Sequence, residues 1–173
     1  MNVARLDHME KIKRVREDFK PVRITTLFVG ESAPAGGTFF YDGNSTLFNA
    51  MKKALVGKET FLEDFQRCGF YLDDLVEEPV NKMEKEARNA RRRESIPSLA
   101  KRLRNYKPEA IVIAMCAIKP MVLQAVLDAR VDCEIYCTPH PAFGNWNRFQ
   151  KAMGEIIDRL PAAGGNKWKD VTL

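Results

Sequence analysis

The sequence has few cysteines and no close pair of them. The four are Cys68, Cys116, Cys133 and Cys137; none belongs to a CxxC pair, and no histidine completes a zinc pattern with them. The pattern therefore excludes common structural zinc modules, and it lacks the ligand spacing of an iron–sulfur cluster. Cys116 and Cys133 lie in or beside apolar runs, so we expect buried, reduced thiols there, in a cytoplasmic protein that uses no metal or other cofactor.

Long apolar segments are also missing. No stretch approaches the roughly 20 apolar residues of a membrane span. The first 20 residues mix acidic and basic side chains and lack the apolar core of a signal peptide. The chain contains no internal repeat and no low-complexity tract. We therefore expect no membrane partner.

What is present is an ordinary globular composition. Hydrophobic residues make up 45% and charged residues 29% of the 173 residues, which suits one domain spanning 1–173. We expect this domain to be a monomer. Lys and Arg number 28 against 23 acidic residues, giving a formal charge of +5. Such a surplus fits a nucleic-acid partner, but many proteins of other function share it.

Four β-rich apolar segments predict the strands of a parallel sheet, at 23–30, 70–76, 110–117 and 133–138. Segments with apolar residues at helical spacing separate them. A further helix is expected within residues 1–20 and another from about 147 to 160, followed by a tail over 161–173. This alternation predicts an α/β fold, a three-layer α/β/α sandwich with a central four-stranded parallel sheet.

Ligands of such sheets bind beyond the carboxyl ends of the strands. The loop after the first strand, 30–41, contains glycines and other small residues that let the backbone approach a ligand, and it matches neither GxxxxGK[ST] nor GxGxxG. Glu31 stands at its start. Phe39, Phe40 and Tyr41 at its end offer a flat surface for a base or sugar. The alternative for Phe39 and Phe40 is that they belong to the core.

The loop after the last strand carries the second candidate group. His140 stands between two prolines, which would hold it rigidly enough to act as an acid, a base or a hydrogen-bond donor. Phe143 and Trp146 are apolar residues suited to wedging between bases. The loop also contains residues suited to phosphate contact, namely Asn145, Asn147 and Arg148. The competing interpretation is a structural histidine and a tryptophan covering the core edge.

Together these loops resemble motifs of the uracil-DNA glycosylase superfamily. The segment that begins Gly30-Glu31-Ser32-Ala33-Pro34 and continues to Tyr41 is similar to motif 1, whose variants include GQDPYH, GINPG and GEAPG. His140-Pro141-Ala142 is similar to the HPS-type motif 2. The order of strands and helices between them also matches, so the resemblance covers about residues 24–160.

The resemblance implies excision of uracil or another deaminated base from DNA, without a metal. Glu31 would position water or stabilise the cationic sugar, and His140 would stabilise charge growing on the base oxygen. The base would bind at Ser32, Phe39, Phe40, Tyr41 and Asp74. The DNA would be contacted by Phe143, Asn145, Trp146, Asn147 and Arg148.

Some features depart from the family pattern. Motif 1 has one extra residue before Pro34, so the water-activating residue is Glu31, Ser32 or neither. Asp73 and Asp74 stand where the family usually has an asparagine that reads uracil, and an ionised carboxylate cannot donate as an amide does. A binding module without catalysis is therefore the alternative, with a small hydrolase or transferase using Glu31 ranked last. The basic cluster around Arg88–Arg93 fits either a DNA contact or a solvated helix face.

Overall fold

A parallel four-stranded sheet forms the centre of the computed structural model, which describes residues 3–33, 35–57, 59–165 and 168. The strands are β1 (Thr26–Ser32), β2 (Phe70–Val76), β3 (Ala110–Ile113) and β4 (Glu134–Cys137). Their order across the sheet is β2-β1-β3-β4, and all neighbouring pairs are parallel. Every residue of β2 and β3 is buried, which explains why β3 is apolar throughout. In β2 the buried residues include two acidic ones, Asp73 and Asp74.

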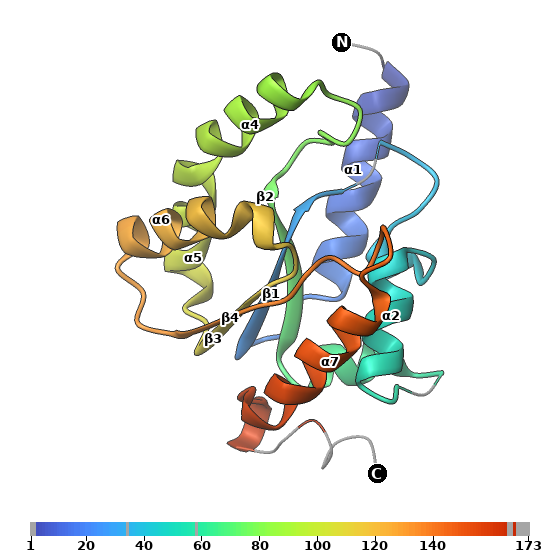
Figure 1. Cartoon of the computed structure of the whole chain (residues 1–173), viewed down its shortest axis with the longest axis vertical. Helices are drawn as coiled ribbons and strands as arrows, with labels where there is room; N and C mark the ends of the chain where they lie inside the picture. The colour runs from blue at the N-terminus through green and yellow to red at the C-terminus, as the bar shows by residue number, and fades with distance from the viewer. Residues whose placement is uncertain (1–2, 34, 58, 166–167, 169–173) are drawn as a thin grey trace.

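Helices cover both faces of the sheet (Figure 1). One face carries α4 (Lys85–Glu94), α5 (Ile96–Tyr106) and α6 (Lys119–Ala129), and the other carries α1 (Val3–Asp18), α2 (Thr46–Ala54) and α7 (Trp146–Ile156). The short helix α3 (Phe61–Arg67) leads into β2. This arrangement confirms the predicted three-layer α/β/α sandwich with a central four-stranded parallel sheet.

Local sequence signals explain where several helices begin. The hydroxyl of Ser45 accepts a hydrogen bond from the backbone N–H of Phe48 at 3.1 Å and so caps α2. Pro97 occupies the first turn of α5, and Pro120 that of α6. The helix predicted within residues 1–20 is α1.

Two boundaries differ from the prediction in ways that affect the site. The first strand runs on to Ser32, so Glu31 lies within β1 rather than in the following loop. The third strand ends at Ile113, and Cys116 begins a separate 3₁₀ turn, Cys116–Ile118, where it is exposed. The expectation of a buried Cys116 was wrong, because the chain turns away from the sheet earlier than its apolar run indicates. Cys133 is partly buried.

An aromatic cluster fills the face of the sheet beneath α2 and α7. Phe28, Phe65 and Phe70 pack ring against ring with centroid separations of 5.3 to 5.6 Å. Trp168, from the segment predicted to be a tail, is 2% exposed, and its ring stacks on Phe70 at 5.6 Å. Part of the C-terminal segment therefore belongs to the core.

Candidate functional site

The two predicted loops begin at the same edge of the sheet, because all four strands run parallel. β1 delivers Glu31 and Ser32 to this edge, and β4 leads directly into the His140 loop. The backbone N–H of Thr138 donates to the carbonyl of Ile113 at 2.9 Å, which attaches the start of the last loop to β3. Burial lowers the pKa of the His140 imidazole, and the negative charge of Glu31 opposes this shift to a smaller extent.

Glu31 is held by two arginines of α4. Its Oε1 accepts from Nε of Arg88 at 2.6 Å and from Nε of Arg92 at 2.7 Å, and both guanidinium groups also form ion pairs with it. The Glu31 side chain is only 10% exposed. Burial alone raises the pKa of this carboxyl, but the hydrogen bonds from Arg88 and Arg92 outweigh it and the net pKa lies below the ordinary value. Glu31 in this arrangement is an ionised, weakly basic carboxylate.

Ser32 has a structural contact in the same region. Its hydroxyl accepts a hydrogen bond from the backbone N–H of Val80 at 3.3 Å. The contact joins the end of β1 to the segment that follows β2. Beside it, the backbone N–H of Ala35 donates to the side-chain oxygen of Asn81 at 3.2 Å.

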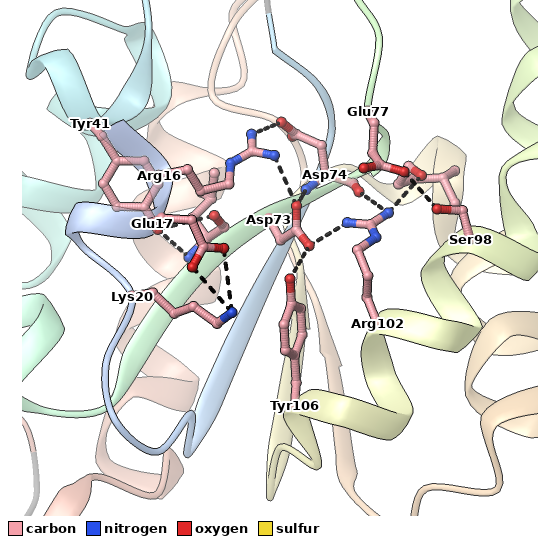
Figure 2. Close-up of polar contacts among 12 residues, drawn as sticks. Arg16, Glu17, Lys20, Tyr41, Asp73, Asp74, Glu77, Ser98, Arg102 and Tyr106 are labelled. Atoms are coloured by element: carbon pink, nitrogen blue, oxygen red, sulfur yellow. Dashed lines mark hydrogen bonds and ion pairs between the residues drawn. The ribbon is translucent and has the colours of Figure 1, made fainter. Parts of the chain in front are cut away.

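Asp73 and Asp74 lie at the centre of a second charged network (Figure 2). Arg16 of α1 donates to Oδ1 of Asp73 at 2.9 Å and to Oδ2 of Asp74 at 2.7 Å. Arg102 of α5 reaches Asp73 from the opposite side, and the Tyr106 hydroxyl donates to Asp73 Oδ2 at 3.0 Å. The network therefore ties one helix from each outer layer to the same point of β2.

The two carboxylates have opposite pKa shifts. Burial raises the pKa of Asp73, but the charges of Arg16 and Arg102 outweigh it, so its pKa is lowered. For Asp74, burial outweighs the charge of Arg16, and the negative charge of Asp73 raises the pKa further. Asp74 also fills the space over Gly30, because a Cβ built there would lie 2.3 Å from Asp74 Oδ1. In this structure Asp74 is an internal ion-pair partner and not an open reader of a base.

The three aromatic residues proposed to stack on a base are buried. Phe39, Phe40 and Tyr41 are each 3 to 4% exposed. The Tyr41 ring stacks on Phe19 at 5.3 Å. Its hydroxyl accepts from the backbone N–H of Leu72 at 2.7 Å and donates to the Leu72 carbonyl at 3.0 Å. Phe39 and Phe40 thus take the core alternative that the sequence left open, and the ring of Tyr41 is packed in the core as well.

The His140 loop presents a different environment. His140 is partly buried, and its Nδ1 accepts a hydrogen bond from the backbone N–H of Ala142 at 3.2 Å. A backbone N–H can only donate, so a neutral His140 carries its proton on Nε2. Burial lowers the pKa of His140, which favours this neutral form. The imidazole is therefore arranged as a hydrogen-bond donor through Nε2.

Phe143 projects from the apex of this loop. Its side chain is 99% exposed, and its backbone has φ of 57°, a left-handed conformation that costs a bulky residue free energy. Gly144 follows with φ of 78°. The side chain of Asn145 donates to the Ala142 carbonyl at 3.3 Å and closes the turn. Asn147 and Arg148 are exposed in the first turn of α7, whereas Trp146 packs partly against the core.

The basic cluster is more internal than either sequence interpretation expected. Arg88 and Arg92 hold Glu31, Arg91 pairs with Glu78 and Glu94, and Arg102 pairs with Asp73. Arg93 and Lys101 are exposed. Apart from Arg91–Glu94, which is an i,i+3 pair, sequence reasoning missed these contacts because the carboxylate partners lie 29 to 61 positions away, or 13 for Arg91 and Glu78. The available signal was the placement of acidic residues, with Glu31 directly after the first predicted strand and Asp73 and Asp74 within the second.

Comparison with protein-family models and with curated proteins found no match. Among residues 3–33, 35–57, 59–165 and 168, no group of three or more His, Cys, Asp or Glu side chains is arranged to hold a metal ion. Within the same residues, no helix is both long enough and apolar enough to cross a lipid bilayer.

Proposed function

We propose that the protein acts on DNA as a base-excision enzyme that resembles uracil-DNA glycosylases, with His140 as its main catalytic residue. The observation that carries the proposal is the loop after β4, which combines an exposed Phe143 with a half-buried donor histidine. An exposed phenylalanine in a left-handed backbone has no packing role to explain it. It suits insertion into a base stack, which costs a few kcal/mol and opens the duplex.

The proposed reaction is hydrolysis of the N-glycosidic bond. The bond between the sugar C1′ and the base nitrogen breaks, and its electron pair leaves with the base. Nε2–H of His140 donates a hydrogen bond to the base oxygen where negative charge grows, as the family resemblance implies. Water supplies its oxygen to C1′, and one of its protons ends on the released base.

Glu31 takes part only if its ion pairs change. With both guanidinium groups bound, its charge is neutralised and its lone pairs are occupied, so it neither accepts a proton well nor stabilises a sugar cation. Arg88 is more exposed than Arg92, 28% against 9% for the side chains. We propose that a DNA phosphate draws Arg88 away and leaves Glu31 with Arg92 alone.

The Glu31–Arg88–Arg92 cluster also supports the second candidate, a DNA-binding module of the same fold without catalysis. Two guanidinium groups against one carboxylate leave a positive excess where an acid–base centre would need a free carboxylate. Such an excess suits phosphate binding. The burial of Asp74 and of the aromatic rings also supports this candidate, because those side chains are not available to hold a flipped base.

Single-turnover assays on duplexes with uracil, hypoxanthine or xanthine test the proposal. We expect excision by the unaltered protein, a loss of about 10²–10³-fold in His140→Ala, and slower excision in Phe143→Ala. Leu127→Ala is the matched control, since it removes an apolar side chain that is 70% exposed elsewhere, on α6. Binding that depends on Phe143 without any excision would favour the module, and no DNA binding would refute both candidates.

A further inference from the structure

Two cysteines far apart in the sequence meet at the carboxyl edge of the sheet. Cys137 is the last residue of β4 and pairs in register with Ile113, the last residue of β3. Cys116 begins the 3₁₀ turn just beyond β3. The thiol of Cys137 donates a hydrogen bond to the sulfur of Cys116 at 3.4 Å. Both are reduced cysteines in this structure.

The two thiols differ in their exposure to solvent, and the pKa of Cys137 is raised. Cys116 is exposed, whereas Cys137 is partly buried. Burial raises the pKa of Cys137 to about 11, and its hydrogen bond to Cys116 raises it too, against a smaller opposing effect of Lys119. An external reagent therefore meets Cys116 first. Cys137 is in place to react second, at close range.

We propose that Cys116 and Cys137 form a reversible dithiol–disulfide site whose oxidant is a small-molecule disulfide. The sulfurs, now 3.4 Å apart, need to approach by roughly 1.4 Å to reach the bonding distance of about 2.05 Å. Small shifts of the exposed Cys116 turn can supply this approach. This inference does not depend on the DNA chemistry proposed above.

The exchange proceeds in two balanced steps. Cys116 loses its proton to solvent, and its thiolate attacks one sulfur of the small disulfide, which forms a mixed disulfide and releases one small thiolate. Cys137 then loses its proton, attacks the Cys116 sulfur and releases the second small thiolate. Each released thiolate takes up a proton from solvent, so the protein loses two electrons and two protons and the small disulfide becomes two thiols.

The bond would act on the neighbouring loop. Cys137 is followed by Thr138, which is buried and bonded to β3, and then by Pro139 and His140. A disulfide from Cys137 to the turn after β3 would add a covalent link just before Thr138. The start of the His140 loop would then be attached to the β3 region by this bond and by the Thr138 hydrogen bond. We expect oxidation to slow hydrogen exchange in residues 138–144 and to leave α1 and β2 unchanged.

Intact-mass analysis of the reduced full chain, incubated with oxidised glutathione, tests the proposal. We expect loss of two hydrogens without a lasting glutathione adduct, reversed by dithiothreitol. Cleavage after Glu134 separates Cys133 from Cys137, so peptide mapping identifies the bonded pair. We expect Cys116 joined to Cys137.

Three single variants assign the roles. Cys137→Ser should accumulate a stable glutathione adduct on Cys116, because the second step is removed. Cys116→Ser should react at least about tenfold more slowly than the unaltered protein. Cys133→Ser is the matched control and should behave as the unaltered protein does, since its thiol is also partly buried and close in sequence.

Some outcomes would overturn the proposal. They are a disulfide that involves Cys133, equal oxidation in Cys116→Ser, or absence of any adduct in Cys137→Ser. The unaltered chain unfolded in urea provides a measurement that needs no substitution. If the folded geometry selects the pair, unfolding must replace the single product with mixed pairings.

Discussion

Gly30 shows how one position depends on a distant side chain. It pairs with Asp74 across the β1–β2 register, and the Asp74 carboxylate occupies the space that a Cβ would need. The glycine is required by this close approach and not by an unusual backbone angle. It also stands at the start of the motif 1-like segment, so a structural demand and a resemblance coincide at the same residue.

Gly30→Ala should therefore destabilise the protein by about 1–3 kcal/mol, because the added methyl group displaces Asp74 from Arg16. Chemical denaturation measures the change. Gly154→Ala is the control: Gly154 lies in α7 with no atom within 4 Å of a built Cβ, so it should gain up to about 1 kcal/mol. Equal stability of the two variants would contradict the role assigned to Asp74.

Asp73→Asn should cost about 3–5 kcal/mol, because it leaves the largely buried guanidinium group of Arg102 without its paired carboxylate and leaves that of Arg16 with Asp74 alone. Glu109→Gln is the comparison, since the pair of Arg23 and Glu109 is exposed and should contribute under about 1 kcal/mol. Urea unfolding of both variants at neutral pH measures the difference. A small effect of Asp73→Asn would mean that the network is not a main link between α1, α5 and β2.

At the scale of elements, α4 supplies both arginines that bind Glu31, and the side chain of Arg88 is more exposed than that of Arg92. Arg92→Ala should destabilise the fold by about 3 kcal/mol, because it leaves a largely buried carboxylate short of a partner. Arg88→Ala should cost about 1 kcal/mol or less. If Arg88 moves to a phosphate, its loss should lower the salt dependence of DNA binding by about one counterion. Unfolding curves and salt titrations separate these effects, and an unchanged salt slope would contradict the exchange of Arg88.

The elements themselves were largely predictable. Runs such as Ala110–Ile113 are apolar throughout because both faces are covered, and this signal is carried by the sequence alone. Strand ends were harder, since Glu31 extends β1 only because α4 supplies two counter-charges. The burial of Phe39, Phe40 and Tyr41 was also undetermined, because an aromatic residue after a strand suits a core and a ligand equally.

For the whole molecule, acid should lower stability in two stages. His140 has a pKa below 6.5, so the stability due to its neutral form is present above pH 6.5 and is lost as the pH falls towards its folded value. Glu31 and Asp73 have lowered pKa values, and their contributions, present above ordinary values of 4.5 and 3.8, are lost at still lower pH. Asp74 has the opposite effect on stability: its pKa is raised, so its contribution is present at low pH and is lost as the pH rises through that pKa.

Thermal melts from pH 8 to pH 3 test this order. His140→Gln should flatten the part of the profile below about pH 6.5 and leave the decline below pH 4.5 in place. Asp73→Asn should do the reverse. A profile that is the same in all three proteins would show that these groups do not govern the acid response.

The chain as a whole is joined through contacts that sequence periodicity does not reveal. Arg16 lies 57 positions from Asp73, and Trp168 donates to the Leu55 carbonyl across 113 positions. Local patterns predict that a helix or a strand exists, but they do not predict which polar side chains pair between elements. The layer architecture could therefore be predicted from the sequence, whereas the arrangement of charges at the carboxyl edge of the sheet could be seen only in the structure.

β2 is an edge strand, and side chains cover backbone groups along its unpaired edge. Tyr41 occupies the backbone groups of Leu72, and Arg102 donates to the carbonyls of Asp74 and Leu75. A strand from another molecule would have to displace a phenol and a guanidinium before it could join there. Polymerisation by strand addition, including amyloid-type growth, is therefore disfavoured at the β2 edge.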